Sequence, residues 1–162
     1  PEAHLVIAGD GECRADLERR ARELQLERRV HFLGVRSDVD PILRTADVAA
    51  MSSDFEGTPL VAYECIANRT PLVATAVGGL LDIIEDGRTG LLVPPRDPAA
   101  LAAALVSLLT DPVRRDRLAT AAADRWEEFT IEAAVRRFAR LYETLAAESG
   151  RPFGATVSAQ HA

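Results

Sequence analysis

Five short apolar runs, separated by helix-like segments, constrain the fold of this chain more than any other feature. Each run ends at glycine, proline or a polar turn, and between the runs apolar residues recur with the spacing of amphipathic helices, about 3.6 residues. Short, continuous apolar strands that alternate with such helices are typical of a parallel sheet covered on both faces. The runs span residues 5–8, 30–33, 48–51, 72–75 and 90–93.

The segments outside these runs predict the helices and the domain limits. We predict an α/β fold, in which a Rossmann-like, three-layer parallel sheet of about five strands has helices on both faces and a helical C-terminal region. Residues 1–148 form one domain by length, and 149–162, which lack periodicity, form a flexible tail. The helices are expected at 12–26, 38–46, 58–68, 80–84, 98–109, 112–128 and 131–148.

The last of these helices is strongly amphipathic. Its apolar face is expected to point inward, and Trp126 and Phe129, which precede it, are expected to anchor it. The residues of that face are Val135, Phe138, Leu141, Tyr142 and Leu145.

Charge and composition exclude several classes of function. The net charge of −6 on 162 residues argues against general binding of nucleic acids or anionic membranes. Every basic residue other than histidine is arginine, so a Schiff-base lysine is excluded and any basic contact to phosphate must come from arginine. No apolar run reaches the length of about 18 residues that a membrane span needs, so none is predicted.

The cysteines and histidines show neither a disulfide framework nor metal-ligand spacing. Cys13 and Cys65 lie far apart in unlike contexts, which indicates reduced thiols and a cytoplasmic protein. His4, His31 and His161 do not have ligand spacing, and no metal site is predicted. Cys65 is expected to be a packed small hydrophobe rather than a nucleophile, because no histidine lies near it in sequence.

One stretch, residues 52–71, carries the candidate chemistry. Glu56 and Gly57 turn the chain, Thr58 is expected to cap the next helix, and Pro59 is expected at its first position. A second carboxylate, Glu64, follows on that helix. Free amides at a helix N-terminus attract anions, phosphate above all. The stretch therefore predicts two carboxylates flanking an anion-binding helix N-terminus.

The turns that follow the predicted strands are the other candidate ligand contacts, because ligands of parallel sheets bind at the carboxyl ends of the strands. These turns span 9–11, 34–38, 52–58 and 77–79. The glycines of 77–79, Gly78 and Gly79, are a turn and a candidate ligand contact. The first turn can be compared with the dinucleotide fingerprint G-x-G-x-x-G, but Arg14 occupies the place of the third glycine, so we favour a plain strand–helix turn.

Glu56 and Glu64, with seven residues between them, resemble the E-x7-E motif of retaining glycosyltransferases of the GT-B fold, most of all the group 1, or family 4, enzymes. The resemblance covers roughly residues 3–145 and identifies the chain with half of a GT-B fold, the C-terminal domain that binds the nucleotide sugar. Four further blocks agree with the family in order and spacing, at 5–11, 30–34, 70–79 and 86–95.

The resemblance implies a role for each candidate residue. Glu56 would lie beside the transferred sugar as the catalytic residue, and Glu64 would accept hydrogen bonds from the ribose hydroxyls. The donor is a nucleoside diphosphate sugar, a substrate, and no cofactor is implied. Amides of the helix start would meet the sugar and the diphosphate, and the residues after the second strand would border the base. These two groups are Gly57, Thr58 and Leu60, and Val35 and Arg36.

The sequence departs from the family pattern in what it lacks. The family's first strand and helix of this domain, and its acceptor-binding N-terminal domain, have no counterpart here, so we expect the isolated chain to be inactive as a hexosyltransferase. In the family order 3-2-1-4-5-6 the missing strand is central. The remaining five strands would close up as 2-1-3-4-5 or leave a gap that another chain fills. Peripheral membrane contact through the full-length enzyme stays open.

Two other classes of function remain beside the enzyme. The chain could be a non-catalytic nucleotide-binding or interaction module that a partner chain completes. A nicotinamide-dependent oxidoreductase domain is disfavoured by the poor fingerprint at 9–14. The sugar, the base and the acceptor are not specified by the sequence.

Overall fold

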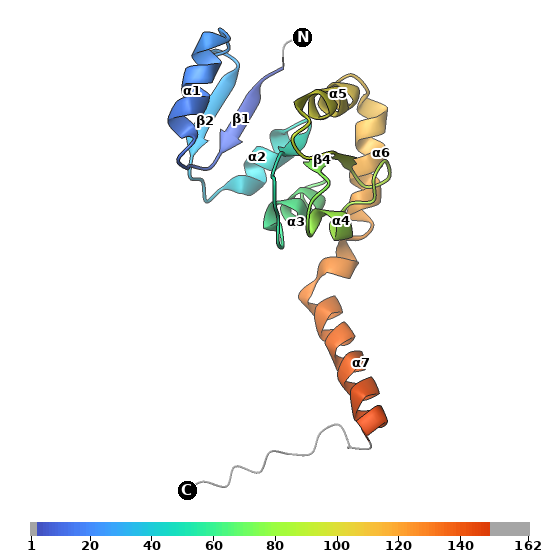
Figure 1. Cartoon of the computed structure of the whole chain (residues 1–162). Coiled ribbons are helices and arrows are strands. Elements are labelled where there is room, and N and C mark those ends of the chain that lie inside the picture. The colour runs from blue at the N-terminus through green and yellow to red at the C-terminus, as the bar shows by residue number, and fades with distance from the viewer. Residues whose placement is uncertain (1–2, 150–162) are drawn as a thin grey trace, which may run out of the picture. The chain divides into compact units, whose positions relative to one another are not determined.

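The computed structural model describes residues 3–149, which divide into two compact units between Ala46 and Asp47 (Figure 1). Unit 1 contains β1 (Leu5–Ala8), α1 (Arg14–Glu23), β2 (Val30–Gly34) and α2 (Val39–Thr45). Unit 2 contains β3 (Ala49–Met51), α3 (Leu60–Ala67), β4 (Leu72–Thr75), α4 (Leu80–Ile83), β5 (Leu91–Val93), α5 (Pro98–Leu109), α6 (Pro112–Ala123), η1 (Trp126–Phe129) and α7 (Ile131–Ser149). The predicted tail, 149–162, lies outside the described residues apart from Ser149.

All strand pairings within the two sheets are parallel, which confirms the α/β class. In unit 1, β1 pairs with β2, and in unit 2 the order is β3-β4-β5. The five strands are thus divided between two small sheets, and the closed-up order 2-1-3-4-5 is not formed. β1 and β3 do not pair, because they belong to different compact units.

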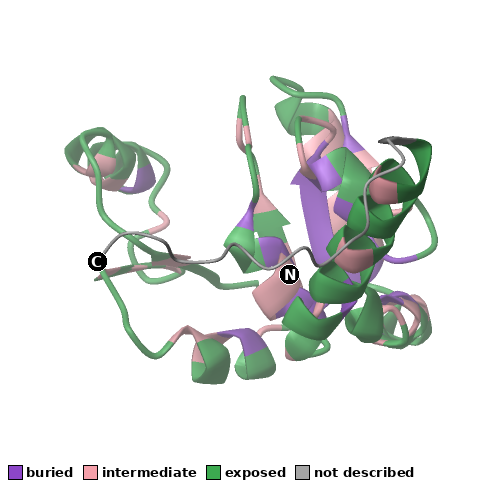
Figure 2. Cartoon of the chain, turned by 90° about the horizontal axis from the view of Figure 1, so that it is seen from below, coloured by how far each residue is buried: buried purple, intermediate pink, exposed green. Residues whose placement is uncertain are grey.

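The core of unit 2 lies around β4. Successive residues of a strand point to opposite faces of the sheet, and all four residues of β4 are buried, so both faces are covered (Figure 2). A cluster of buried side chains from β4, β5, α5 and α6 fills the space between the sheet and these helices. Its members are Val73, Leu91, Val93, Leu108 and Leu118.

Unit 1 buries much less. Among residues 3–46, the buried apolar side chains are Ala21 of α1 and Leu43 of α2. In β1, Leu5 and Val6 are 50% and 45% exposed, and in β2 every second residue is exposed. The predicted coverage of both sheet faces is therefore confirmed for β4 and not for β1 and β2.

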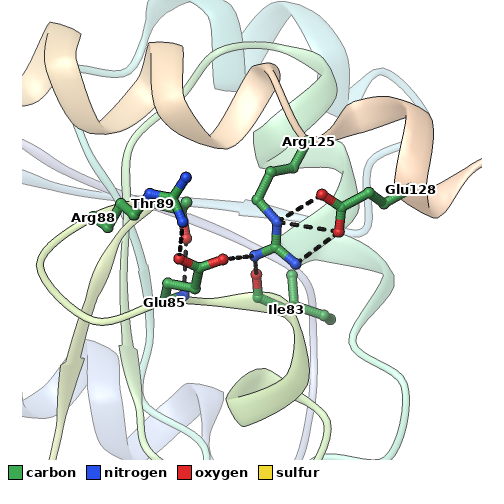
Figure 3. Close-up of polar contacts among 6 residues, drawn as sticks. All are labelled: Ile83, Glu85, Arg88, Thr89, Arg125 and Glu128. Atoms are coloured by element: carbon green, nitrogen blue, oxygen red, sulfur yellow. Dashed lines mark hydrogen bonds and ion pairs between the residues drawn. The ribbon is translucent and has the colours of Figure 1, made fainter.

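A turn of 3-10 helix, η1, interrupts the helix predicted at 112–128, and α6 ends at Ala123. Arg125, with its side chain 17% exposed, ties this turn to the end of α4 (Figure 3). Its Nη1 donates to the carbonyl of Ile83 at 3.2 Å and lies 3.1 Å from Oε1 of Glu85, while Nη2 pairs with Glu128 at 2.9 Å. Helix α6 ends at Ala123 because these contacts hold Arg125 against the loop that follows α4.

Of the two residues expected to anchor the last helix, Phe129 makes ring contacts, whereas Trp126 is 39% exposed. The ring of Phe129 lies 5.2 Å from the ring of Tyr63 in an edge-to-face arrangement and 5.2 Å below the guanidinium of Arg125. Beyond it, α7 packs mainly against η1. The prediction that the apolar face of α7 points inward is wrong for the described chain: Phe138 is 59% and Leu145 50% exposed, because the helix extends past the elements it could cover. Within residues 3–149, no helix combines the length and apolarity that crossing a membrane requires.

Candidate functional site

The Glu56 loop, residues 52–59, connects the carboxyl end of β3 to α3. Two hydrogen bonds determine its path. The hydroxyl of Thr75, a residue only 4% exposed at the end of β4, donates to the carbonyl of Ser53 at 2.6 Å. The hydroxyl of Ser53 in turn donates to Oε1 of Glu56 at 2.6 Å. The Glu56 carboxylate is half-buried and is thereby connected to the sheet through Ser53.

The glycine turn, residues 77–79, supports the other side of this loop. A Cβ on Gly78 would lie 1.8 Å from the carbonyl oxygen of Glu56, and one on Gly79 would lie 2.1 Å from that of Gly57. The amide of Gly79 donates to the carbonyl of Glu56 at 3.3 Å. Gly78 also has a φ of +47°, which favours glycine. The glycines expected to contact a ligand thus allow the backbone of the Glu56 loop to approach the turn.

Helix α3 begins later than its sequence predicts. Thr58 does not cap it, and Pro59 is the residue before the first helical turn, with extended dihedral angles of −76° and 96°. Because Pro59 has this extended conformation, the helix starts one residue later, at Leu60. The first amides of the helix, those of Leu60 and Val61, precede any intrahelical acceptor. They remain available to an anion beside Glu56.

Glu64 lies one turn into α3, on its more exposed side. The predicted inward face of Leu60, Glu64 and Ala67 is the open face, because Ala62 and Cys65, with Ile66, supply the buried one. Within residues 3–149, no side chain donates a hydrogen bond to the carboxylate of Glu64, and this residue is half-buried. It can therefore accept hydrogen bonds from a ligand.

Cys65 is confirmed as a packed residue. It is 1% exposed, and burial raises the pKa of its thiol to about 12, with a further contribution from the adjacent Glu64. The thiol is therefore neutral near pH 7, and a neutral thiol is a poor nucleophile.

A third contact of the Glu56 loop comes from the loop after β5. Nε and Nη2 of Arg96 donate to Oδ2 of Asp54 at 3.1 and 3.0 Å. This hydrogen bonding, together with the charge of the guanidinium, lowers the pKa of Asp54. Arg96 has a φ of +59°, an uncommon conformation for a residue with a side chain. The pair is exposed, so its contribution to stability is small.

The predicted base-bordering residues lie in unit 1, directly after β2. Val35 and Arg36 line an open hollow together with Ser37 and Asp38. The guanidinium of Arg36 donates to both carboxylate oxygens of Asp38, at 2.8 and 2.6 Å, and lowers the pKa of Asp38. The side chain of Val35 is 82% exposed. Both residues are accessible to a ligand, and the hollow is polar because of the ion pair.

Unit 2 therefore brings together the catalytic candidate Glu56, the helix start at Leu60, and the glycine turn, with Glu64 one turn further along α3. The sequence did not single out four side chains of this region: Ser53, Asp54, Thr75 and Arg96. The spacing Ser-x-x-Glu is that of a capping box, but a capping box predicts bonds from side chains to backbone amides at a helix start, and not the bond between the two side chains that is seen here. The Asp54–Arg96 pair joins residues 42 positions apart and had no local signal.

Residues 1–125 match the family model of the glycosyl transferases group 1. The chain belongs to this family. Among curated members, it is 35% identical to an alpha-D-kanosaminyltransferase of Streptomyces kanamyceticus, over 89% of this chain and 38% of that protein. It is 40% identical to a D-inositol 3-phosphate glycosyltransferase of Corynebacterium urealyticum, over 80% of this chain and 31% of that protein. The chain thus spans well under half the length of these relatives.

Solved structures of group 1 relatives share the fold, which confirms the GT-B assignment. HepE of Anabaena in complex with UDP-glucose aligns with a TM-score of 0.80 and 27% identity, over 91% of this chain and 42% of that one. Sucrose-phosphate synthase of Thermosynechococcus elongatus aligns with a TM-score of 0.75 and 35% identity, over 89% and 38%. The chain is therefore a glycosyltransferase domain.

Proposed function

We propose that this chain is the donor-binding domain of a retaining, family 4 glycosyltransferase that moves a sugar from a nucleoside diphosphate sugar to an acceptor. The observation that carries the proposal is the Glu56 loop, in which the Glu56 carboxylate accepts a hydrogen bond from Ser53 on the path from the carboxyl end of β3 to the start of α3. The complex of HepE with UDP-glucose supports a nucleotide sugar as the donor.

The proposed roles follow from the chemistry of the donor. Breaking the bond from the sugar C1 to the diphosphate leaves growing negative charge on the diphosphate, which amide dipoles near Gly57, Thr58 and Leu60 stabilise. Glu56 lies beside the sugar. The Glu64 carboxylate presents two acceptors, which match the two hydroxyl donors of a ribose. No cofactor takes part, because the donor itself supplies the activated bond.

The rest of the enzyme is also part of the proposal. Val35 and Arg36 border the base, and the glycine turn, besides supporting the Glu56 loop, contacts the ligand. An acceptor-binding domain outside residues 3–149 completes the cytoplasmic enzyme, and we expect no sugar transfer by the isolated chain. The proposal is supported by the curated relatives, of which this chain covers 31% and 38%.

A second candidate is a non-catalytic module that binds a nucleotide or docks to a partner chain. The observation that favours it is the exposure of β1, where Leu5 and Val6 are about half exposed although strands of parallel sheets are normally covered. A partner chain that completed the sheet would cover them.

Calorimetric titration separates these functions. The chain is titrated with UDP, GDP, ADP, their glucose or mannose conjugates, and NAD. We expect one nucleoside diphosphate and its sugar conjugate to bind, and NAD not to bind. Glu64→Gln should weaken binding by about 10- to 100-fold, the loss expected for hydrogen bonds to a charged group. Glu143→Gln, which makes the same change on exposed α7, is the matched control and should bind as the wild type does.

The outcomes differ between the candidates. Sugar transfer by the isolated chain would contradict the incompleteness of the site. Binding of nucleotide without any effect of Glu64→Gln, in this chain and in the full-length enzyme, would remove the ribose role. Absence of binding by every nucleotide would favour the docking module, and binding of NAD would favour the oxidoreductase.

A further inference from the structure

We propose that Ser53 and Thr75 are positioning residues that orient the Glu56 carboxylate toward the donor sugar. The inference rests on the proposed function, since it assigns to Glu56 the place beside the transferred sugar. Neither residue would touch the reacting atoms. They act by fixing one oxygen of the carboxylate and the backbone that carries it.

The first step is the bond between Ser53 and Glu56. An ionised carboxylate has no proton to donate, so the hydroxyl of Ser53 is the donor to Oε1. The separation of 2.6 Å lies in the range of short, charge-assisted hydrogen bonds between a hydroxyl and a carboxylate. Because the bond occupies Oε1, the other carboxylate oxygen is left to accept from a sugar hydroxyl.

The second step is the support of Ser53 itself. Thr75 is 4% exposed at the carboxyl end of β4, where it pairs in register with Val93 of β5. Its hydroxyl donates to the carbonyl of Ser53 at 2.6 Å. A buried hydroxyl has little access to water as an alternative partner, so this bond keeps the Ser53 backbone at the end of the sheet.

The third step is that the two bonds act in series. The sheet holds Thr75, Thr75 holds the Ser53 carbonyl, and the Ser53 hydroxyl holds Glu56. The bond from the Gly79 amide fixes the Glu56 carbonyl and leaves the carboxylate itself to Ser53. Removing the hydroxyl of Ser53 therefore frees the carboxylate to change rotamer while the main chain of the loop stays in place.

The test separates positioning from folding by comparing two ligands. Whichever of UDP, GDP and ADP binds the chain most tightly is titrated alone and as its glucose or mannose conjugate. Ser53→Ala should weaken binding of the conjugate by about 5- to 20-fold, in line with the loss of a hydrogen bond to a charged group, and leave binding of the diphosphate unchanged. Ser53→Thr keeps the hydroxyl and should restore binding of the conjugate.

Ser107→Ala is the matched control, because it removes a serine hydroxyl that donates to the carbonyl of Ala104 at 2.7 Å within α5, outside the Glu56 loop. It should bind both ligands as the wild type does. Thr75→Val replaces the buried hydroxyl by a methyl group of similar size. Like Ser53→Ala, it should weaken binding of the sugar conjugate. An equal loss for diphosphate and conjugate, or a Ser53→Ala variant that binds the conjugate normally, would overturn the positioning role.

A crystal structure of the Ser53→Ala variant tests the inference without any ligand. We expect the Glu56 carboxylate to leave its place while the backbone from Ser52 to Gly57 is retained. An unmoved carboxylate would overturn the inference even if the nucleotide proposal held. Conversely, if the wild type binds no nucleotide but the carboxylate moves, the geometric role of Ser53 stands and only the donor-binding proposal fails.

Discussion

The same two residues, leucine followed by valine, open β1 in unit 1 and β4 in unit 2, and they end in opposite environments. Leu72 and Val73 of β4 are 4% and 0% exposed, whereas Leu5 and Val6 of β1 are 50% and 45% exposed. The local sequence thus shows that each segment forms an apolar strand. It does not show what will cover the strand, which depends on elements elsewhere in the chain.

The difference has a structural cause in the neighbours of each strand. β4 is paired on both edges, with β3 and β5, and α5 packs against it. β1 is paired only with β2. Unit 2 therefore contains most of the buried apolar surface of the described chain, and we expect it to provide most of the stability.

The largest difference between the units is expected when the same substitution is made in β4 and in β1. Leu72→Ala should lower the free energy of unfolding by about 2–4 kcal/mol, because it removes a buried side chain and leaves a cavity. Leu5→Ala should lower it by less than about 1 kcal/mol, because the leucine is half exposed. Denaturant unfolding is followed by far-UV circular dichroism, with Trp126 fluorescence as the probe of unit 2. Equal losses would show that β1 is covered in solution.

The next largest difference is expected in the stability lost when a glycine of each unit is replaced by alanine. Gly79→Ala places a methyl group 2.1 Å from the carbonyl of Gly57, so the Glu56 loop must shift at a cost of about 1–3 kcal/mol. Gly11→Ala in the turn after β1 meets nothing within 4 Å and should change stability by less than about 1 kcal/mol. Thermal unfolding of both variants measures the difference. A Gly79→Ala variant as stable as the wild type would mean that the loop does not lie against the glycine turn.

Hydrogen exchange tests the comparison without mutation. The amides of β4 should exchange at least about tenfold more slowly than those of β1 and β2, because a strand covered on both faces opens only when unit 2 unfolds. Mass spectrometry of peptides spanning residues 5–8 and 72–75 gives the two rates. Similar protection would contradict the assignment of stability to unit 2.

The sequence was sufficient for the elements, whereas the roles given to the residues of the central motif stay predictions. Every predicted strand and helix exists, because apolar runs ending at turns and helical periodicity are local signals. Glu56 was singled out as a carboxylate ahead of a helix start, and the resemblance gave it a role. Gly78 and Gly79 were singled out through their freedom of backbone conformation, and in the structure they support the Glu56 loop. The spacing Ser-x-x-Glu did not indicate the bond of Ser53, because the capping box with that spacing joins side chains to backbone amides.

Other features depend on contacts that sequence spacing does not encode. The end of α6 depends on how Arg125 meets Glu85 and Ile83, forty or more positions earlier. The open face of α7 depends on the absence of a covering element among residues 3–149 and not on the helix, whose amphipathic pattern predicted burial. Helix α3 starts later than predicted because Pro59, which was expected at its first position, is extended and lies before it.

The smallest expected effect compares the exposed ion pairs of the two units. Asp54 pairs with Arg96 across 42 positions, whereas Asp38 pairs with Arg36 two positions away, and the pKa of each aspartate is lowered. A carboxyl with a lowered folded pKa stabilises the fold above its unfolded pKa, and this stabilisation is lost as the pH falls through the folded pKa. A pair two residues apart can also form in the unfolded chain, which reduces its net effect.

Asp54→Asn should therefore lower the denaturant midpoint at pH 7 slightly more than Asp38→Asn does, and both variants should converge with the wild type as the pH is lowered toward 3. Asp82→Asn, an exposed aspartate of α4, is the control for removing a negative charge. Denaturant titrations at several pH values measure the midpoints at low salt, where exposed pairs are least screened. If the denaturant midpoint of Asp54→Asn were lower than that of the wild type by the same amount at all pH values, the loss of stability would come from packing of the side chain. The Asp54–Arg96 pair would then contribute no charge interaction to the Glu56 loop.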